Sequence, residues 1–146
     1  MASRTGGIAK VVARTFLRTA VWMYRRSGGK VGGTLFGVPL LLLTTVGRRS
    51  GRSWTVPLMQ QTDRDRWVII ASNGGSAKHP AWWLNLRSQP DASIQIGRET
   101  YPVTAVEATG EERERLWRLM ADMYRGYDGY EKKTTRKIPV ILLHRR

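Results

Sequence analysis

A short basic turn at residues 47–52, Gly-Arg-Arg-Ser-Gly-Arg, is the first group whose residue types could do chemistry. It lies between two apolar segments, so the sequence predicts a tight connection between two strands. Its glycines let the backbone approach an anion closely, and its arginines can bind a phosphate through paired hydrogen bonds. An isolated basic hairpin turn is more often simply solvated, so both interpretations stay open on this pattern alone.

A second group is Lys-His-Pro-Ala-Trp-Trp-Leu-Asn-Leu at residues 78–86, which follows a glycine-containing loop at residues 72–76. Pro80 suits the start of a short helix that ends near Ser88. We do not expect Trp82 and Trp83 both to face the core from one short helix, so one is predicted to line a cleft or an interface. The free N–H groups at the helix start favour an anion, whereas His79 alone is more typical of a surface or capping residue than of a catalyst.

Three phenols recur at steps of three residues, where the last predicted helix gives way to a glycine-containing turn. They are Tyr124, Tyr127 and Tyr130. On one side of the chain they could cap an apolar pocket and donate hydrogen bonds to a carbonyl or nitro oxygen. Composition alone favours the plainer interpretation, an aromatic patch that seals the core.

The composition excludes most other kinds of catalytic site. The 146 residues include no cysteine, and the two histidines, His79 and His144, are far apart and lack metal-site spacing, so we expect no bound metal. No carboxylate occurs in residues 1–62, which argues against a carboxylate-dyad hydrolase in that half. A protein so equipped either binds a ligand or takes its chemistry from a cofactor.

The charge is strongly positive and unevenly distributed. The formal net charge is +14, with ten basic and no acidic residues in residues 1–62 and fifteen basic against eleven acidic in residues 63–146. Such a field attracts polyanions, whether nucleic acid, an anionic membrane surface or a phosphorylated cofactor. A hydrophobic content of 41% excludes a disordered basic tail, and the length suits one domain with its own core.

Residues 8–24 have the periodicity of a helix with an apolar stripe and a basic back. The stripe is Ile8, Val12, Phe16, Thr19 and Met23, and the basic back is Lys10, Arg14, Arg18 and Arg25. The pattern is typical of a membrane-interface helix, and equally of one that packs its stripe on its own domain. Because no run could span a membrane and no signal peptide is evident, we expect a cytoplasmic protein, with residues 8–26 as a candidate contact with the inner face of an anionic membrane.

The remaining elements must position these groups. Strands are predicted at residues 40–45, 54–61, 67–71, 93–96, 101–106 and 139–143, and Thr109 and Glu112 predict a capping box that opens a helix to about Tyr124. About six mainly antiparallel strands and three helices indicate a small α+β, barrel-like domain. Five glycines in residues 27–37 predict a flexible connection, so we expect an N-terminal helix and linker at 1–34 and the domain proper at 35–146.

Taken in order, the segments at 42–51, 55–58, 71–75, 78–86 and 109–113, followed by the three tyrosines, strongly resemble one family. This is the deazaflavin-dependent nitroreductase and quinone reductase family of actinobacteria, and the resemblance covers about residues 22–143. It implies a split β-barrel like that of the flavin-binding pyridoxamine oxidases. It also implies coenzyme F420, a deazaflavin with a phosphate and a polyanionic oligoglutamate tail, as the cofactor of residues 35–146.

The resemblance also implies roles for individual residues. Tyr127 matches the tyrosine that faces ring and substrate, and Tyr124, Tyr130 and Ser72 are the other implied catalytic residues. Arg48, Arg49 and Ser50 would hold the phosphate and tail. The full set of implied cofactor-binding residues is Arg48, Arg49, Ser50, Trp54, Thr55, Val56, Pro57, Leu58, Met59, Ala71, Ser72, Asn73, Lys78, Ala81, Trp82, Trp83, Leu84, Asn85 and Tyr127.

Three positions depart from common members of the family. Trp54 stands where a basic residue is frequent, Asn73 where lysine is frequent, and Met59 where a substrate-side tyrosine can occur. The first two would weaken binding of the tail, although Arg52 and Lys78 are nearby in sequence. Met59 puts reduction of bicyclic nitroimidazoles in doubt, because a soft apolar group replaces a phenol.

The hypothesis is therefore an oxidoreductase in which reduced F420 gives a hydride to a menaquinone-like quinone or to a nitroaromatic acceptor. A hydrogen bond from Tyr127 would stabilise the charge that develops on the acceptor oxygen. Two alternatives stay open: a deazaflavin carrier without turnover, and, less favoured, a nucleic-acid binder. The oligomeric state is not indicated by the sequence.

Overall fold

The computed structural model describes the backbone of residues 4–146 and the side chains from residue 12 onward. Its helices are α1 Arg4–Ser27, α2 Ala81–Ser88, α3 Gly110–Met123 and α4 Gly126–Lys133, with one 3-10 turn, η1 Asn73–Gly75. Its strands are β1 Thr34–Leu35, β2 Val38–Val46, β3 Ser53–Met59, β4 Gln61–Asp63, β5 Arg66–Ile70, β6 Asp91–Ile96, β7 Glu99–Glu107 and β8 Val140–Arg145.

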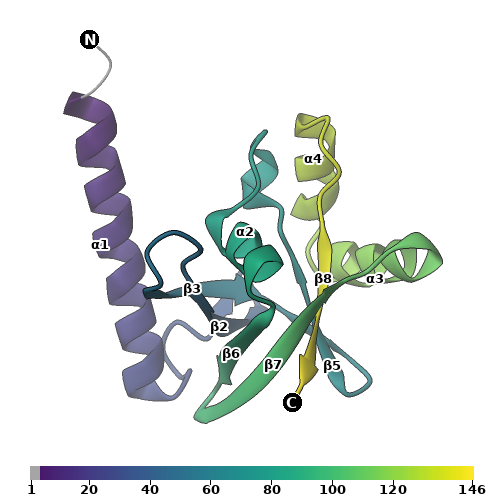
Figure 1. Ribbon diagram of the computed structural model, residues 1–146, viewed down its shortest axis with the longest axis horizontal. Helices are drawn as coiled ribbons and strands as arrows, with labels where there is room; N and C mark the ends of the chain where they lie inside the picture. Colours follow the sequence, from purple (N-terminus) through teal and green to yellow (C-terminus); the bar gives the residue numbers. More distant parts are fainter. Residues whose placement is uncertain (1–3) are drawn as a thin grey trace.

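The eight strands form one curled antiparallel sheet, with the helices around it (Figure 1). The hydrogen-bonded order is β1-β2-β6-β7-β8-β5-β4, and β3 pairs with β2. The predicted α+β split barrel is confirmed by this topology together with the solved structures described below. The two strands beyond the expected six are the short β1 and β4, and β4 is separate because Gln60 interrupts the strand that was expected to continue to residue 61.

Strands β5 and β8 are buried on both faces, which explains their nearly continuous apolar sequences. Ile69 and Ile141 point into the barrel core, whereas Val68 and Leu142 pack with Leu116 in a second core beneath α3 and α4. Successive side chains of a strand face opposite ways, so one strand serves both cores. Helix α4, which was not expected, packs against this second core and carries two of the three tyrosines.

The expected capping box at the start of α3 is not formed. Thr109 is the N-cap residue, but its side chain makes no capping hydrogen bond. The carboxylate of Glu112, the other member of the box, instead pairs with Arg66 at 3.5 Å. The helix still begins where the sequence indicated, with an extended Thr109 as N-cap and Gly110, at a φ of 60°, as its first residue.

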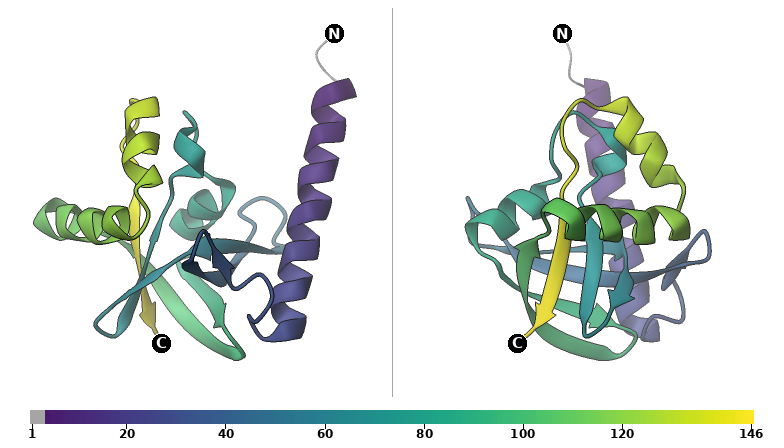
Figure 2. Two further views of the ribbon diagram at one scale, coloured as in Figure 1. Left: turned by 180° about the vertical axis from the view of Figure 1, so that it is seen from behind. Right: turned by 90° about the vertical axis from the view of Figure 1, so that its right-hand side faces the viewer.

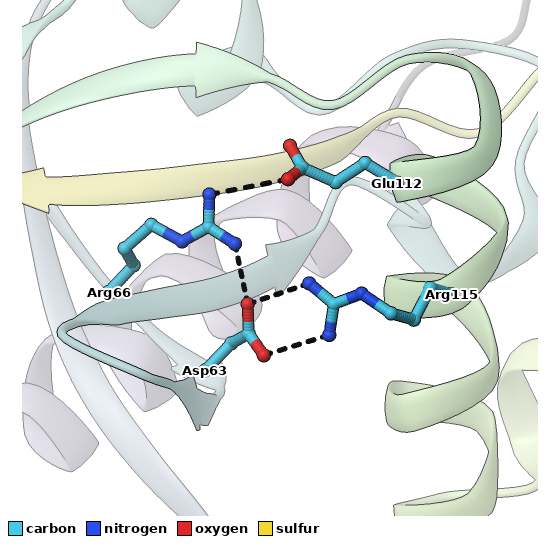
Figure 3. Close-up of polar contacts among 4 residues, drawn as sticks. All are labelled: Asp63, Arg66, Glu112 and Arg115. Atoms are coloured by element: carbon cyan, nitrogen blue, oxygen red, sulfur yellow. Dashed lines mark hydrogen bonds and ion pairs between the residues drawn. The ribbon is translucent and has the colours of Figure 1, made fainter.

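An ion-pair cluster ties the β4–β5 hairpin to α3 (Figure 3). Both carboxylate oxygens of Asp63 accept hydrogen bonds from Arg115, at 2.9 Å each, and one also accepts from Arg66. These two guanidinium groups hold the pKa of Asp63 well below its ordinary value. The cluster fixes the outer end of the hairpin against the helix.

Helix α1 packs on the domain only near its C-terminal end, and its N-terminal half stands clear of the sheet (Figures 1 and 2). Val21 and Tyr24 pack on the outer face of β2, and the Tyr24 hydroxyl accepts the Gly97 N–H at 3.0 Å. The helix turns the predicted apolar stripe away from the domain, because Val12 is 61% and Phe16 76% exposed. The interpretation in which the stripe packs on its own domain is therefore wrong for Val12 and Phe16, whereas the side chain of Ile8 lies outside the described residues. No helix within residues 4–146 is long and apolar enough to cross a membrane.

Candidate functional site

The first cavity of interest, about 400 Å³, lies between the basic turn and the start of α2. We call it the basic pocket. It is lined by Arg14, Gly47, Arg48, Arg49, Ser50, Trp54, Val56, Ala81, Trp82 and Asn85. Three arginines and no carboxylate contribute to this lining, and the positive end of the α2 dipole adds to their field. The pocket is built to hold an anion.

Asn85 fixes the basic turn on α2. The side chain is only 4% exposed, and its Oδ1 accepts hydrogen bonds from the backbone N–H and the Nη1 of Arg48, at 3.2 Å each. Its Nδ2 donates to the Oγ1 of Thr45 at 3.1 Å. The Oδ1 of Asn85 thus positions Arg48, and its Nδ2 ties the side chain to Thr45; this role was not foreseen from the sequence.

The second cavity, about 250 Å³, is apolar apart from hydroxyl groups. We call it the tyrosine pocket. It is lined by Leu35, Phe36, Leu40, Pro57, Leu58, Met59, Ile70, Ser72, Gly74, Tyr124, Tyr127 and Tyr130. The structure thus brings Ser72 and all three tyrosines to one cavity, although composition favoured a patch that only seals the core.

The three phenols are not equivalent. Tyr124 and Tyr130 hydrogen-bond to each other at 3.1 Å, and this bond is the main cause that raises the pKa of Tyr130. Tyr127 is 4% exposed, yet within the described part of the chain its hydroxyl has no hydrogen-bond partner. Burial raises the pKa of Tyr127 above its ordinary value, so the phenol stays protonated at neutral pH. Tyr127 therefore keeps a hydrogen-bond donor free at the pocket.

Strand β3 connects the two cavities. Val56 lines the basic pocket, and the next two residues, Pro57 and Leu58, line the tyrosine pocket. Thr55 lies in neither lining, and its hydroxyl hydrogen-bonds to Thr44 at 2.7 Å and to Arg25 at 2.9 Å. The two pockets thus adjoin successive parts of β3.

Comparison with known proteins identifies the family to which the chain belongs. The family model of the F420H(2)-dependent quinone reductases matches residues 16–145. The chain belongs to this family. A Mycobacterium tuberculosis protein named as an F420H(2)-dependent quinone reductase is 44% identical over 109 residues, which is 75% of this chain and 92% of that protein.

Two solved structures support the same assignment. An F420-H2 dependent reductase, 41% identical, superposes with a TM-score of 0.68 over 73% of this chain and 94% of its own. A second structure, described as a domain-swapped dimer, is 34% identical and has the same TM-score over 97% of this chain and 100% of its own. The reductase is thus an F420H2-dependent oxidoreductase, with coenzyme F420 as its cofactor.

The described residues fit that cofactor. The basic pocket offers a phosphate Arg48, Arg49 and the start of α2, and no carboxylate opposes it there. Val56 and Leu58 give β3 an apolar surface between the pockets, which suits a planar ring. The uncharged tyrosine pocket suits an uncharged acceptor.

Arg136 of the reductase, which no sequence motif indicated, holds the loop that carries Ser72. Its guanidinium donates to the carbonyl oxygens of Ser72 at 2.7 Å, Ser76 at 2.8 Å and Ala71 at 3.2 Å, and contacts the Nδ1 of His79 at 3.1 Å. Burial, followed by the charge of Arg136, lowers the pKa of His79, so this ring is neutral at neutral pH and accepts the hydrogen bond at Nδ1. His79 and Arg136 position the loop.

The other predicted cofactor residues lie outside both linings. Ala71 and Trp83 are buried in the barrel core, Leu84 is half-buried, and Asn73 and Lys78 are exposed. The side chain of Asn73 donates to the carbonyl of Lys78 at 3.0 Å. Trp82 lines the basic pocket, as predicted for one of the two tryptophans, but it also packs in the same core as Trp83, so the expectation that only one of them could face the core is wrong.

Sequence reasoning also missed Phe36 and Gly75. The ring of Phe36 stacks on Tyr124, with centroids 6.1 Å apart, at the tyrosine pocket. Gly75 allows η1 to approach α4 closely, because a Cβ there would lie 3.0 Å from the Tyr130 carbonyl oxygen. Its positive φ of 83° was indicated by the glycine pair in the loop, but its contact with α4 was not.

Proposed function

We propose that the reductase holds the phosphate of coenzyme F420 in the basic pocket and the redox ring along β3. The quinone then occupies the tyrosine pocket. Bound F420H2 supplies a hydride, and the protein aligns the two reactants and excludes water. This arrangement is supported by the position of β3, which lines the anion-binding cavity at Val56 and the uncharged cavity at Leu58.

The free hydroxyl of Tyr127 is the observation that carries the proposal. Negative charge develops on the quinone oxygen during reduction, and a donor already in place lowers the energy of that charge. Tyr127 can donate without breaking an existing hydrogen bond, whereas in the Tyr124–Tyr130 pair one hydroxyl donates to the other and only the accepting phenol keeps its O–H free. Ser72 and this pair are the neighbouring groups that complete the polar side of the pocket.

Replacement of Tyr127 by Phe tests this role. We expect Y127F to lower kcat for a soluble quinone by about 10²-fold, the usual cost of one such donor, and to leave the affinity for F420 unchanged. Y101F is a matched control, because Tyr101 packs on Trp67, lines neither pocket and loses a hydroxyl in the same way. An unchanged kcat in Y127F would remove this residue from the mechanism.

Nitroaromatic compounds are a second class of acceptor, because a nitro oxygen can accept the same hydrogen bond from Tyr127. Met59 lines the tyrosine pocket and offers sulfur and methylenes in place of a donor. We therefore expect simple quinones to be reduced faster than bicyclic nitroimidazoles, and M59Y to raise the nitroimidazole rate selectively. Equal rates in the two proteins would show that residue 59 does not select the acceptor.

Peripheral contact with the inner face of an anionic membrane is a further part of the proposal. It is supported by the exposed stripe of α1, with Val12 and Phe16 largely exposed and Met23 partly so. Such a helix can lie in the lipid interface, where a quinone such as menaquinone is dissolved. The reductase would then take its acceptor from the membrane.

Liposome sedimentation tests this contact in the full chain. The F16S/M23S variant should lose sedimentation with anionic liposomes and keep its activity on soluble quinones. Substitution is preferable to deletion of residues 1–26, because deletion also removes Val21 and Tyr24 from the outer face of β2. A dimer in solution that dissociates in F16S/M23S would overturn the membrane contact and assign the stripe to a second copy of the chain.

A further inference from the structure

A third cavity, about 360 Å³, lies between α1 and the start of β3 and is strongly basic. We call it the α1 groove. The side chains that matter in its lining are Arg14, Arg18, Trp22, Arg25, Arg52 and Trp54. The roles proposed above do not explain why so many arginines line this groove.

The α1 groove adjoins the basic pocket, because Arg14 and Trp54 line both. A ligand anchored by a phosphate beside Arg48 and Arg49 can therefore continue past Trp54 into the groove.

The groove presents a ladder of positive charge. Arg14, Arg18 and Arg25 are spaced by four and seven residues, so they fall on one side of α1 and span about 16 Å along it. Arg52 faces them from the turn before β3. No carboxylate lines the groove, and no ion pair among the described residues includes any of these four arginines.

Four arginines without counter-ions repel one another, so an anion that binds among them is favoured. The spacing along the helix suits an extended chain with several carboxylates better than a single compact anion. Arg25 is partly committed by its hydrogen bond to Thr55, whereas Arg18 and Arg52 lie only in the groove lining.

We propose that the α1 groove binds the oligoglutamate tail of coenzyme F420, so that α1 is a wall of the cofactor site and gives the reductase its preference for tail length. The inference rests on the proposed binding of the phosphate in the basic pocket. It also answers the loss of basic residues at Trp54 and Asn73, because the arginines of α1 supply the charge that those positions lack.

The test is a fluorescence-polarisation titration of oxidised F420 in two forms, one without glutamates and one with a long tail. Wild-type protein should bind the long-tailed form at least tenfold more tightly. R18Q/R52Q should remove most of this difference and leave the affinity for the tail-free form within twofold. The matched control K30Q/R64Q loses the same charge at two exposed residues outside the groove and should behave as wild type.

Each other outcome has a definite meaning. Equal affinity of wild-type protein for the two forms overturns the inference and leaves the phosphate site standing. An equal loss in R18Q/R52Q and K30Q/R64Q shows a general charge effect and also overturns it. Loss of binding to anionic liposomes in R18Q/R52Q with the tail preference intact assigns the groove to lipid headgroups. No binding of either form to wild-type protein defeats the proposed phosphate site itself.

Discussion

Asn85 offers the sharpest test of how the basic pocket is built. Its amide makes three hydrogen bonds, two with Arg48 and one with the buried Thr45, and almost none of its surface reaches solvent. Replacement by Ala leaves the Arg48 N–H and the Thr45 hydroxyl without this partner and opens a small cavity. We expect N85A to lose about 2–4 kcal/mol of unfolding free energy.

For a chain of this length, such a loss lowers Tm by roughly 5–15 °C. The same change should weaken F420 binding by about tenfold, because one charge-assisted contact worth roughly 1.4 kcal/mol is no longer held in place. Thermal unfolding followed by tryptophan fluorescence and a polarisation titration of F420 measure the two effects separately.

The N85D variant separates positioning from charge. Its carboxylate has the shape of the amide and can accept both bonds from Arg48, while the Thr45 hydroxyl rotates to donate to it. It therefore unfolds at a higher temperature than N85A, but it places a negative charge in the basic pocket and binds F420 more weakly than N85A does. The two readouts should rank the variants in opposite order.

A single result refutes this reasoning. If N85A keeps the Tm of the wild-type protein and still loses F420 affinity, then Asn85 acts on the cofactor directly, as the family resemblance implied, and not through Arg48. If N85A and N85D rank in the same order in both assays, the negative charge at residue 85 does not weaken F420 binding.

Two further predictions concern the surroundings of the tyrosine pocket. Phe36 and Gly37 form a two-residue hairpin turn with φ of 52° and 77°, a conformation that suits Asn-Gly. F36N should therefore raise the unfolding free energy by about 1 kcal/mol, and it should also raise KM for quinones, because the ring at the pocket is lost. A destabilised F36N with an unchanged KM would contradict both parts. His79 has a folded-state pKa below its ordinary value of 6.5, so stability should fall as pH drops below about 6.5, where the unfolded chain takes up the proton first. H79N, which can still accept from Arg136, should flatten this part of a plot of Tm against pH, and an unchanged slope would assign the dependence to other groups.

Local patterns were sufficient for most of the fold. The apolar runs at residues 40–45 and 67–71 predicted β2 and β5, and the glycine turns fixed where the strands reverse. The short β1 and β4 were missed because two or three residues carry no measurable alternation. Helix α4 was missed because its sequence, Gly-Tyr-Asp-Gly-Tyr-Glu-Lys-Lys, has two glycines and a weak apolar face, and its place depends on packing over η1.

The candidate site likewise contains residues that local motifs indicated and residues that they did not. Arg48, Ser72 and Tyr127 could be proposed because the order of motifs resembles a family, and the structure places Arg48 in the basic pocket and Ser72 and Tyr127 in the tyrosine pocket. Arg136 could not be proposed, because it reaches Ser72 from a segment 64 residues away that has no local signal. Long-range hydrogen bonds of this kind depend on the tertiary fold, so a single sequence does not specify them.

The N-terminal helix shows how a correct element can be given the wrong orientation. Its strongest apolar periodicity, which includes Val12 and Phe16, faces solvent, whereas the helix packs on β2 through the weaker set that includes Val21 and Tyr24. The packed face has a weaker apolar pattern in the sequence, because the arginines that line the α1 groove flank it. By helical geometry the exposed stripe and these arginines lie well over 90° apart around α1. The same helix can therefore contact a membrane through its stripe and still present Arg18 to the cofactor tail. The two proposals for α1 are compatible.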